Sequence, residues 1–272
     1  AQASLLSLNE MATASTELVE AFDGAADAAG NAERAFGNAT LSRIDAENNE
    51  QAAHGGLART QGALENGNVV GAGEQSNLTT LAALASRGAA DSARGYSETA
   101  KSESTRAHGF QTSADRPRPV VEQYGASREA FVAAAASRRD AIDAADLAAA
   151  DLSSQAQFFD DVAQVLAARA GTGAAADSAA GSSSARALAL AAASQLSAAA
   201  AQAHDMEQTA STNAGRLFGK SMSQYVARAQ AAAAGAEGQS QLAGAAATRA
   251  EASATAARNL VSGVGTNSPP SR

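Results

Sequence analysis

The fold of this chain is decided by residues 8–39, LNEMATASTELVEAFDGAADAAGNAERAFGNA, in which small or apolar residues recur at alternating steps of three and four. These positions are Leu8, Met11, Ser15, Leu18, Phe22, Ala25, Ala29, Ala32, Phe36 and Ala39. A stripe that recurs every 3.5 residues on average is hidden from water only if the segment is a helix that lies along other helices. The stretch therefore predicts a long helix with a coiled-coil-like seam.

A second stretch in the middle of the chain keeps the same spacing. It passes through Val121, Tyr124, Arg128, Phe131, Ala135, Arg138, Ile142, Ala145, Ala149, Leu152, Ala156, Phe159, Ala163 and Leu166. Alanines separate the large residues on both stripes, so we expect neighbouring backbones to approach to the low end of the usual interaxial distance of about 8 to 10 Å. Arg128 and Arg138 indicate a partly hydrated stripe, because a buried guanidinium requires a carboxylate partner.

The composition favours helices throughout. Alanine supplies about three residues in ten, several times its share in an average domain, and aromatic residues make up 4%. Alanine has the highest helix propensity, and no run of alternating Val, Ile, Thr or Tyr is long enough for a strand. The sequence predicts an all-α fold, an elongated antiparallel bundle of three to four long helices.

Glycine, proline and serine divide the chain into segments. We expect helices over about residues 4–54, 77–112, 119–170 and 184–260, in a single elongated bundle over 1–262 that is followed by a disordered tail at 263–272. Gly55-Gly56 is expected to end the first helix, residues 62–75 to form a flexible connection, and Asn77 to cap the second helix.

Three further features of the chain are expected from the same signals. Pro117 and Pro119 predict a turn, and the Gly/Ser-rich residues 171–184 predict a second loop. The last helix is expected to kink or break between Gly235 and Gly244. The expected apolar faces comprise Leu78, Leu81, Ala85, Ala89, Ser92, Tyr96, Ala100, Ala107 and Phe110 on the second helix, and Leu188, Ala192, Leu196, Ala199, Ala203, Met206, Ala210 and Leu217 on the fourth.

Charge and composition exclude several classes of partner. The net charge is −8, and no cluster of Lys and Arg has the density that phosphate contacts require, so nucleic acid is not expected as a partner. The absence of cysteine excludes disulfides and thiol catalysis. No stretch is apolar enough to span a bilayer. Because the chain starts Ala1-Gln2-Ala3, as a mature or trimmed polypeptide would, we expect any targeting peptide or lipid anchor to have been left off.

Catalytic and metal signatures do not stand out. His54, His108 and His204 lie in three different predicted helices without the H-E-x-x-H pattern, and His54 and His108 fall close to predicted helix ends. The acidic pairs Asp160-Asp161 and Asp143 with Asp146 are expected to be a solvated face. The prediction is that the protein is no enzyme and holds neither cofactor nor metal. Two sequons mark Asn38 and Asn77 as candidate N-glycosylation sites, a number that chance alone would produce.

The organisation as a whole resembles a known family. A cysteine-free, alanine-rich chain with two long heptad helices, a proline turn and a Ser/Gly loop that leads through Ser182-Ser183-Ser184-Ala185-Arg186-Ala187-Leu188 into another alanine-rich helix is similar to the alanine-rich surface proteins of insect-stage trypanosomes. The resemblance implies an elongated helical bundle that packs densely as a coat. It also implies that the only contact with the membrane is a C-terminal glycolipid anchor, which is absent from this chain. The related glutamate/alanine-rich proteins are much more acidic than this chain.

The leading hypothesis is thus a non-enzymatic coat glycoprotein on the extracellular face of a cell, a narrow helical rod with neighbouring copies as its partners. One alternative is a surface receptor on the same bundle plan that binds a host or vector ligand in a groove between helices. Another is a bacterial helical assembly or secretion component whose seams pair between subunits.

Overall fold

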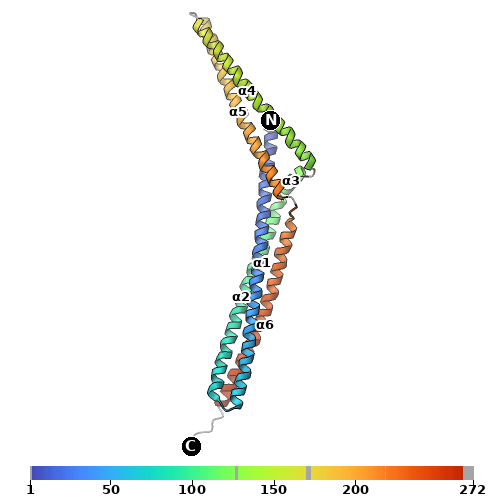
Figure 1. Ribbon diagram of the computed structural model, residues 1–272, viewed down its shortest axis with the longest axis vertical. Coiled ribbons are helices and arrows are strands. Elements are labelled where there is room, and N and C mark those ends of the chain that lie inside the picture. The colour runs from blue at the N-terminus through green and yellow to red at the C-terminus, as the bar shows by residue number, and fades with distance from the viewer. Residues whose placement is uncertain (1, 126–127, 170–172, 218, 266–272) are drawn as a thin grey trace. The chain divides into compact units, whose positions relative to one another are not determined.

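The computed structural model describes residues 2–125, 128–169, 173–217 and 219–265, and within these ranges the chain contains helices and no strand. The helices, shown in Figure 1, are α1 (Gln2–Glu65), α2 (Val69–Asp115), α3 (Arg118–Gly125), α4 (Arg128–Arg169), α5 (Gly173–Leu217) and α6 (Met222–Gly265). The predicted all-α class is confirmed.

The helices form two compact units. Unit 1 comprises residues 1–20 and 114–219, and unit 2 comprises residues 21–113 and 220–272. The first residues of α1 therefore belong to unit 1 and the remainder of this helix to unit 2. The sequence had predicted one bundle over 1–262, because an uninterrupted heptad stripe in α1 carries no mark at the point where its packing partners change.

In unit 2, α1, α2 and α6 lie side by side (Figure 1). The Ser86 hydroxyl of α2 donates a hydrogen bond of 2.8 Å to the Ala46 carbonyl of α1, and Gly56 of α1 contacts Thr79 of α2. Residue numbers thus rise along α1 as they fall along α2, so these two helices are antiparallel. In α6 the numbers rise with those of α1, since Glu33 meets Arg228 and Glu50 meets Arg249.

The core of unit 2 is a seam of small residues that recurs with a strict period of seven. Every seventh residue is buried along α1 (Ala25, Ala32, Ala39, Ala46, Ala53, Thr60), α2 (Ala72, Thr79, Ser86, Ala93, Ala100, Ala107) and α6 (Met222, Ala229, Ala236, Ala243, Ala250, Ala257). A second buried set lies between them and is also dominated by alanine and serine. A period of seven keeps the seam facing its partners along the whole length of three supercoiled helices.

Glycines of unit 2 receive the aromatic rings that this narrow core cannot otherwise hold. A Cβ atom built on Gly24 would lie 2.5 Å from Cζ of Phe110, and one on Gly235 would lie 2.8 Å from Cε2 of Phe36. Each ring therefore sits on helix backbone where any side chain would collide with it. Phe22 also meets Tyr225 edge to face, at a centroid separation of 6.5 Å.

The turn between α1 and α2 is built by Asn66, Gly67 and Asn68. Gly67 has φ of +72°, and the amides of Gly67 and Asn68 donate to the carbonyls of Leu64 (3.0 Å) and Ala63 (2.8 Å), which is a Schellman motif. The Asn68 side chain then accepts a hydrogen bond of 2.9 Å from the Gly71 amide and caps α2.

This turn corrects the predicted connection. Gly55-Gly56 does not end α1, residues 62–75 are largely helical, and Asn77 lies inside α2. Gly56 is tolerated in mid-helix because Thr79 of α2 fills the space that its side chain would occupy. The predicted proline turn is confirmed, since α2 ends at Asp115 and α3 begins at Arg118.

The predicted helices over 119–170 and 184–260 differ from the structure in their boundaries. The first contains two helices, α3 and α4, and α5 already begins at Gly173, inside the predicted loop 171–184. The break in the last segment falls at Gly219, which has φ of +72°, whereas α6 runs without interruption through Gly235 and Gly244. Of the predicted tail, residues 263–265 belong to α6, and residues 266–272 lie outside the described part of the chain.

The predicted apolar face of α2 is confirmed at Ala100 and Ala107, which are buried. It is wrong at five members that are exposed: Leu78, Leu81, Ala85, Ser92 and Tyr96. The adjacent Thr79, Ala83 and Ser86 are buried instead.

The predicted face of α5 is confirmed at Ala203 and Ala210, which are buried. It is wrong at Leu188, Ala192 and Leu196, which are exposed, while Ala193 is buried instead. A leucine in the seam would push the helices apart, so the small residues take the interior.

The stripe in residues 8–39 is confirmed wherever side chains are described, because every member from Met11 to Ala39 is buried except the half-buried Phe36. In the second stripe Ala149 and Ala156 are buried and Leu152 is half-buried, but Phe159 is 43% exposed. Val121 is half-buried. The side chains of the remaining members are outside the described part of the structure: Leu8 in the first stripe and Tyr124, Arg128, Phe131, Ala135, Arg138, Ile142, Ala145, Ala163 and Leu166 in the second.

In unit 1, α4 and α5 pack along each other. Leu147, Phe158 and Val165 of α4 are exposed, and Phe158 and Phe159 stack edge to face at 6.0 Å between ring centroids. The buried contacts of this pair that are described come again from alanines, among them Ala149, Ala156 and Ala193.

Two glycines of α1 provide a test of the close-packed core. We expect Gly56→Ala to lower the free energy of unfolding by about 1 to 3 kcal/mol, because its Cβ would lie 3.2 Å from the buried Thr79 Cβ and 3.4 Å from the Thr79 Cα. Gly37→Ala, at a helical position open to solvent, should instead stabilise by up to about 1 kcal/mol. Urea unfolding followed by far-UV circular dichroism measures both, and equal effects would contradict the packing argument.

Candidate functional site

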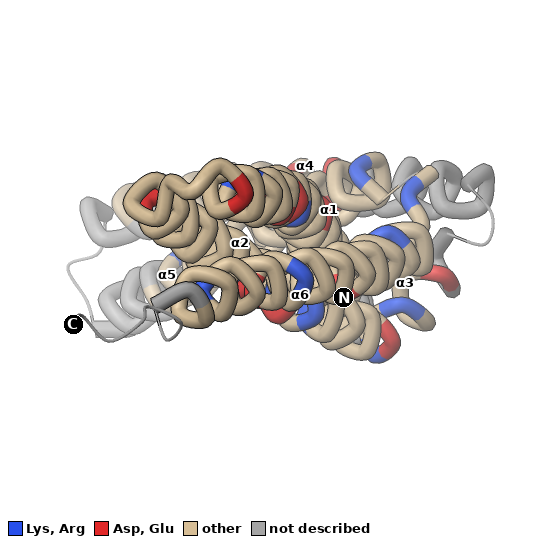
Figure 2. The backbone as a smooth tube through the Cα atoms, turned by 90° about the horizontal axis from the view of Figure 1, so that it is seen from below, with Lys and Arg blue, Asp and Glu red and all other residues tan. Residues whose placement is uncertain are grey.

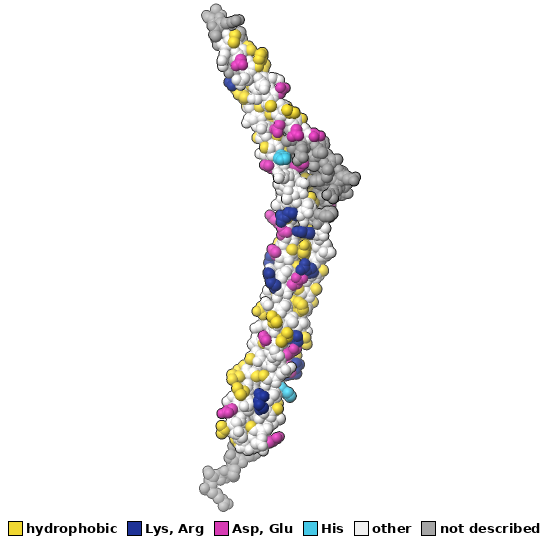
Figure 3. All heavy atoms as spheres, in the orientation of Figure 1, with side chains coloured by type: hydrophobic (Ala, Val, Ile, Leu, Met, Phe, Trp, Pro, Cys, Tyr) yellow, Lys and Arg dark blue, Asp and Glu magenta, His cyan; other side chains and the backbone are white. Residues whose placement is uncertain are grey.

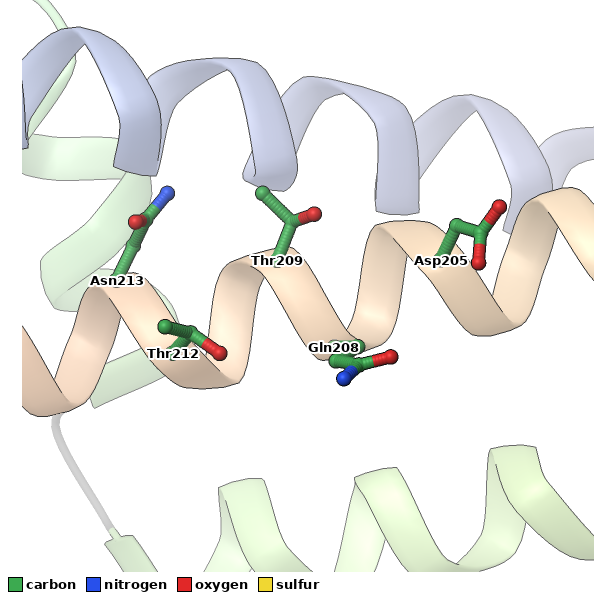
Figure 4. Close-up of a pocket in the computed structure, with 5 residues that line it drawn as sticks. All are labelled: Asp205, Gln208, Thr209, Thr212 and Asn213. Atoms are coloured by element: carbon green, nitrogen blue, oxygen red, sulfur yellow. The ribbon is translucent and has the colours of Figure 1, made fainter.

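Polar side chains of α5 line a groove of about 410 Å³ in unit 1. The lining residues are Asp205, Gln208, Thr209, Thr212 and Asn213. Asp205, Thr209 and Asn213 follow one another at steps of four and point toward α1, while Gln208 and Thr212 lie on the neighbouring side of α5 (Figure 4). Four of the five are exposed and Asn213 is buried, so the groove is open to solvent along most of its length.

Asn213 joins this groove to the first part of α1. Its side-chain amide donates to the hydroxyl of Ser15 at 3.1 Å and to that of Thr16 at 3.0 Å. Both hydroxyls in turn donate to the Ala12 carbonyl, at 2.8 and 3.0 Å. A buried amide that finds its partners at one alignment of two helices fixes their register, because any slip leaves it without hydrogen bonds.

The groove offers hydrogen bonds. The lining residues that the structure describes supply one carboxylate, two amides and two hydroxyls, and none of them is a histidine, lysine or cysteine. Throughout the described residues, no three His, Asp or Glu side chains gather where they could hold a metal ion. The arrangement could bind a polar group through its amides and hydroxyls, and it shows no acid–base pair.

In unit 2, ion pairs connect the helices. Arg228 of α6 holds Glu33 of α1 through two bonds of 2.8 Å, and Arg249 holds Glu50 in the same way. Lys101 of α2 meets Glu237 of α6 at 2.9 Å. Figure 2 shows both acidic and basic residues along the helices.

The arginine pairs shift the titration of their glutamates. Hydrogen bonds from Arg228 and Arg249, which outweigh the opposing desolvation, lower the pKa of Glu33 and of Glu50 below the ordinary value of 4.5. The same pairing raises the pKa of both arginines. Both pairs are partly exposed, so each contributes modestly to stability and more to the alignment of α1 with α6.

The histidines and acidic pairs do not come together. His54, His108 and His204 are exposed on α1, α2 and α5, and His54 lies well inside α1 and not near a helix end as predicted. Asp143, Asp146 and Asp161 are exposed, whereas the side chain of Asp160 lies outside the described residues.

The two sequons lie on helices. Asn38 and Asn77 are exposed, and Thr40 donates to the Phe36 carbonyl at 3.0 Å. Thr79 is fully buried in the seam and bonds to the Gln75 carbonyl at 2.7 Å. Packing in the seam is therefore a sufficient reason for a threonine at position 79, without any role in glycosylation. Glycosylation of Asn38 or Asn77 stays a prediction.

The sequence did not predict the contacts that hold the helices against one another. Asn213, the glycine–phenylalanine contacts and the interhelical ion pairs all join segments far apart in the chain. The period of seven through Ala72, Thr79 and Ser86 was the available signal for the buried face of α2, but it is carried by small residues beside more apolar leucines.

Comparisons with known proteins add little. No protein-family model and no curated protein matches the sequence. One similar solved structure is the SmhB pore of the tripartite alpha-pore forming toxin Smh from Serratia marcescens, with 11% identity over 96% of this chain and 86% of that chain and a TM-score of 0.30. None of the described helices is both long and apolar enough to cross a membrane.

The hydrogen bonds that join Asn213 of α5 to Ser15 and Thr16 of α1 can be tested with the substitution Asn213→Ala. We expect the free energy of unfolding to fall by about 1 to 2 kcal/mol, because two hydrogen bonds of a buried amide are lost. Thr212→Ala removes an exposed hydroxyl of the same groove and should change the free energy of unfolding by less than about 0.5 kcal/mol. Thermal unfolding by circular dichroism compares the two, and an unchanged Asn213→Ala variant would contradict a role in register.

The lowered pKa values of Glu33 and Glu50 predict a loss of stability in acid. Because both values lie below 4.5 in the folded state, the contribution is complete above the unfolded pKa and disappears as pH falls through the folded pKa. The fall in melting temperature between about pH 6 and pH 3 should be smaller in the double variant Glu33→Gln, Glu50→Gln than in the wild type. Glu98→Gln, at an exposed site of α2, should follow the wild-type profile.

Proposed function

We propose that this protein is a non-enzymatic coat protein of a cell surface, in which narrow helical bundles stand side by side. The elongated bundle of three to four long helices that the sequence predicts is part of the proposal. So are a C-terminal lipid anchor outside this chain, an extracellular location, and neighbouring copies as partners.

The observation that supports this function is the alanine seam of unit 2. Helices of about 45 residues, near 70 Å at 1.5 Å per residue, approach closely along their whole length because alanine, serine and glycine line the contact. Such a bundle covers a surface with little cross-section per molecule. Ion pairs between its helices lie on the outside of the bundle. The surface in Figure 3 shows charged side chains dispersed along the visible face.

A second candidate is the surface receptor. The polar groove at Asp205 and Asn213 favours it, because amides, hydroxyls and a carboxylate can all form hydrogen bonds with a polar ligand. The third candidate, a helical assembly component, requires seams that pair between subunits. In unit 2 the seam closes within one chain, which favours the first two.

Solution scattering with mass measurement tests the bundle on which the coat depends. At low protein concentration we expect a mass near the 26.9 kDa of one chain and a cross-sectional radius of gyration of about 8 to 10 Å, as three or four close helices give. A compact particle of similar length, width and depth would contradict the proposal.

Staining of the cells that produce the protein tests its location. An antibody against the folded chain should label intact cells as strongly as permeabilised cells. Labelling that appears only after permeabilisation would exclude the coat and the receptor together.

A further inference from the structure

Three leucines form a row on the solvent side of α2. Leu78, Leu81 and Leu84 are 52%, 62% and 60% exposed, and steps of three place them next to one another on the outer face of the helix. The buried residues between them, Thr79 and Ala83, face α1 and α6. The largest apolar side chains of this segment thus lie in water, although alanines fill the core beside them.

The three leucines are equally spaced, so Leu78 and Leu84 lie at the same distance from Leu81 on either side of it. If a second copy of α2 lies antiparallel on the first, with a two-fold axis at Leu81, then Leu81 meets its own counterpart. Leu78 of each copy meets Leu84 of the other. A self-complementary patch of this kind is what a two-fold symmetric dimer requires, because the same residues form both sides of the interface.

Charges on either side of the row match the same arrangement. Glu74 lies seven residues before Leu81 and therefore on the same face of α2, and it is exposed. Arg87 lies six residues after Leu81, so the two-fold axis places Glu74 of one copy beside Arg87 of the other, at both ends of the row. Arg87 is able to turn there because its contact with Glu251 is long, 3.4 Å, and its side chain is 65% exposed.

Glycine permits the close approach that this pairing needs. Gly88 lies on the same outer face as Glu74 and Leu81, and a Cβ atom built there would meet nothing within 4 Å. The antiparallel arrangement sets Gly88 opposite Glu74, where the missing side chain leaves room for the carboxylate to reach Arg87 of the second copy.

We propose that the outer face of α2, from Glu74 to Gly88, is an interface through which two copies of this chain pair with two-fold symmetry. Three leucines per copy bury less area than the roughly 1,200 Å² of stable complexes, so we expect a dissociation constant on the order of 100 µM. The inference rests on the surface of unit 2 alone and holds whether or not the protein is a coat.

Cysteine crosslinking tests the contact at the axis directly. The natural chain has no cysteine, so Leu81→Cys introduces a single thiol, which a short bismaleimide should link to its counterpart at high protein concentration. Leu242→Cys is the matched control, because Leu242 of α6 is similarly exposed, at 52%, and lies off the proposed face. Equal crosslinking of the two variants would overturn the proposal.

Sedimentation equilibrium up to about 1 mM protein, well above the expected dissociation constant, tests the charges. We expect Glu74→Arg and Arg87→Glu each to weaken dimerisation about tenfold, and the double variant to restore it. Leu81→Glu should abolish dimerisation with an unchanged circular dichroism spectrum, since the site is exposed. A monomeric wild type, dimerisation that survives Leu81→Glu, or a double variant without recovery would each refute the interface. A monomer that binds lipid vesicles through this row would refute it as well.

Discussion

Unit 2 depends on close contact between helix backbones at small side chains. Alanine, serine or threonine occupies almost every seventh position of α1, α2 and α6, and the three series coincide layer by layer. A methyl group removes little apolar area from water, so the hydrophobic gain per residue is low. What the small residues add is contact between backbones over a long distance, where many weak dispersion contacts accumulate.

This constraint explains the other unusual features of the unit. Two phenylalanines pack where the facing helix offers glycine, Phe110 on Gly24 and Phe36 on Gly235. Hydroxyl groups enter the core because they bond to carbonyls within reach, as Thr60 does to Gly56 and Ser86 to Ala46. Leucines are displaced to the outside, where they become available to partners. A thin core and an apolar exterior row are thus two results of one packing requirement.

Unit 1 follows a related pattern with a different means of alignment. A buried asparagine holds α5 against the start of α1. An amide in the interior is costly unless both of its hydrogens find acceptors, and Ser15 and Thr16 supply them at a single register. The polar groove beside it therefore begins at a structural contact, which limits how far that groove can change shape on binding.

The sequence by itself determined that the chain is helical, where the proline turn lies, and which face of α1 is buried. These follow from local propensity and from an uninterrupted stripe that contains its own large residues, such as Leu18 and Phe22. The candidate groove and the glycine contacts could not be predicted, because each joins residues that only folding brings together. The tertiary structure decided that Gly55-Gly56 stays helical while Gly67 turns, and that Leu78 and Leu81 face water. The reason is that the buried face of a helix is chosen by the room its neighbours leave, and between closely approaching backbones that room admits alanine and excludes leucine.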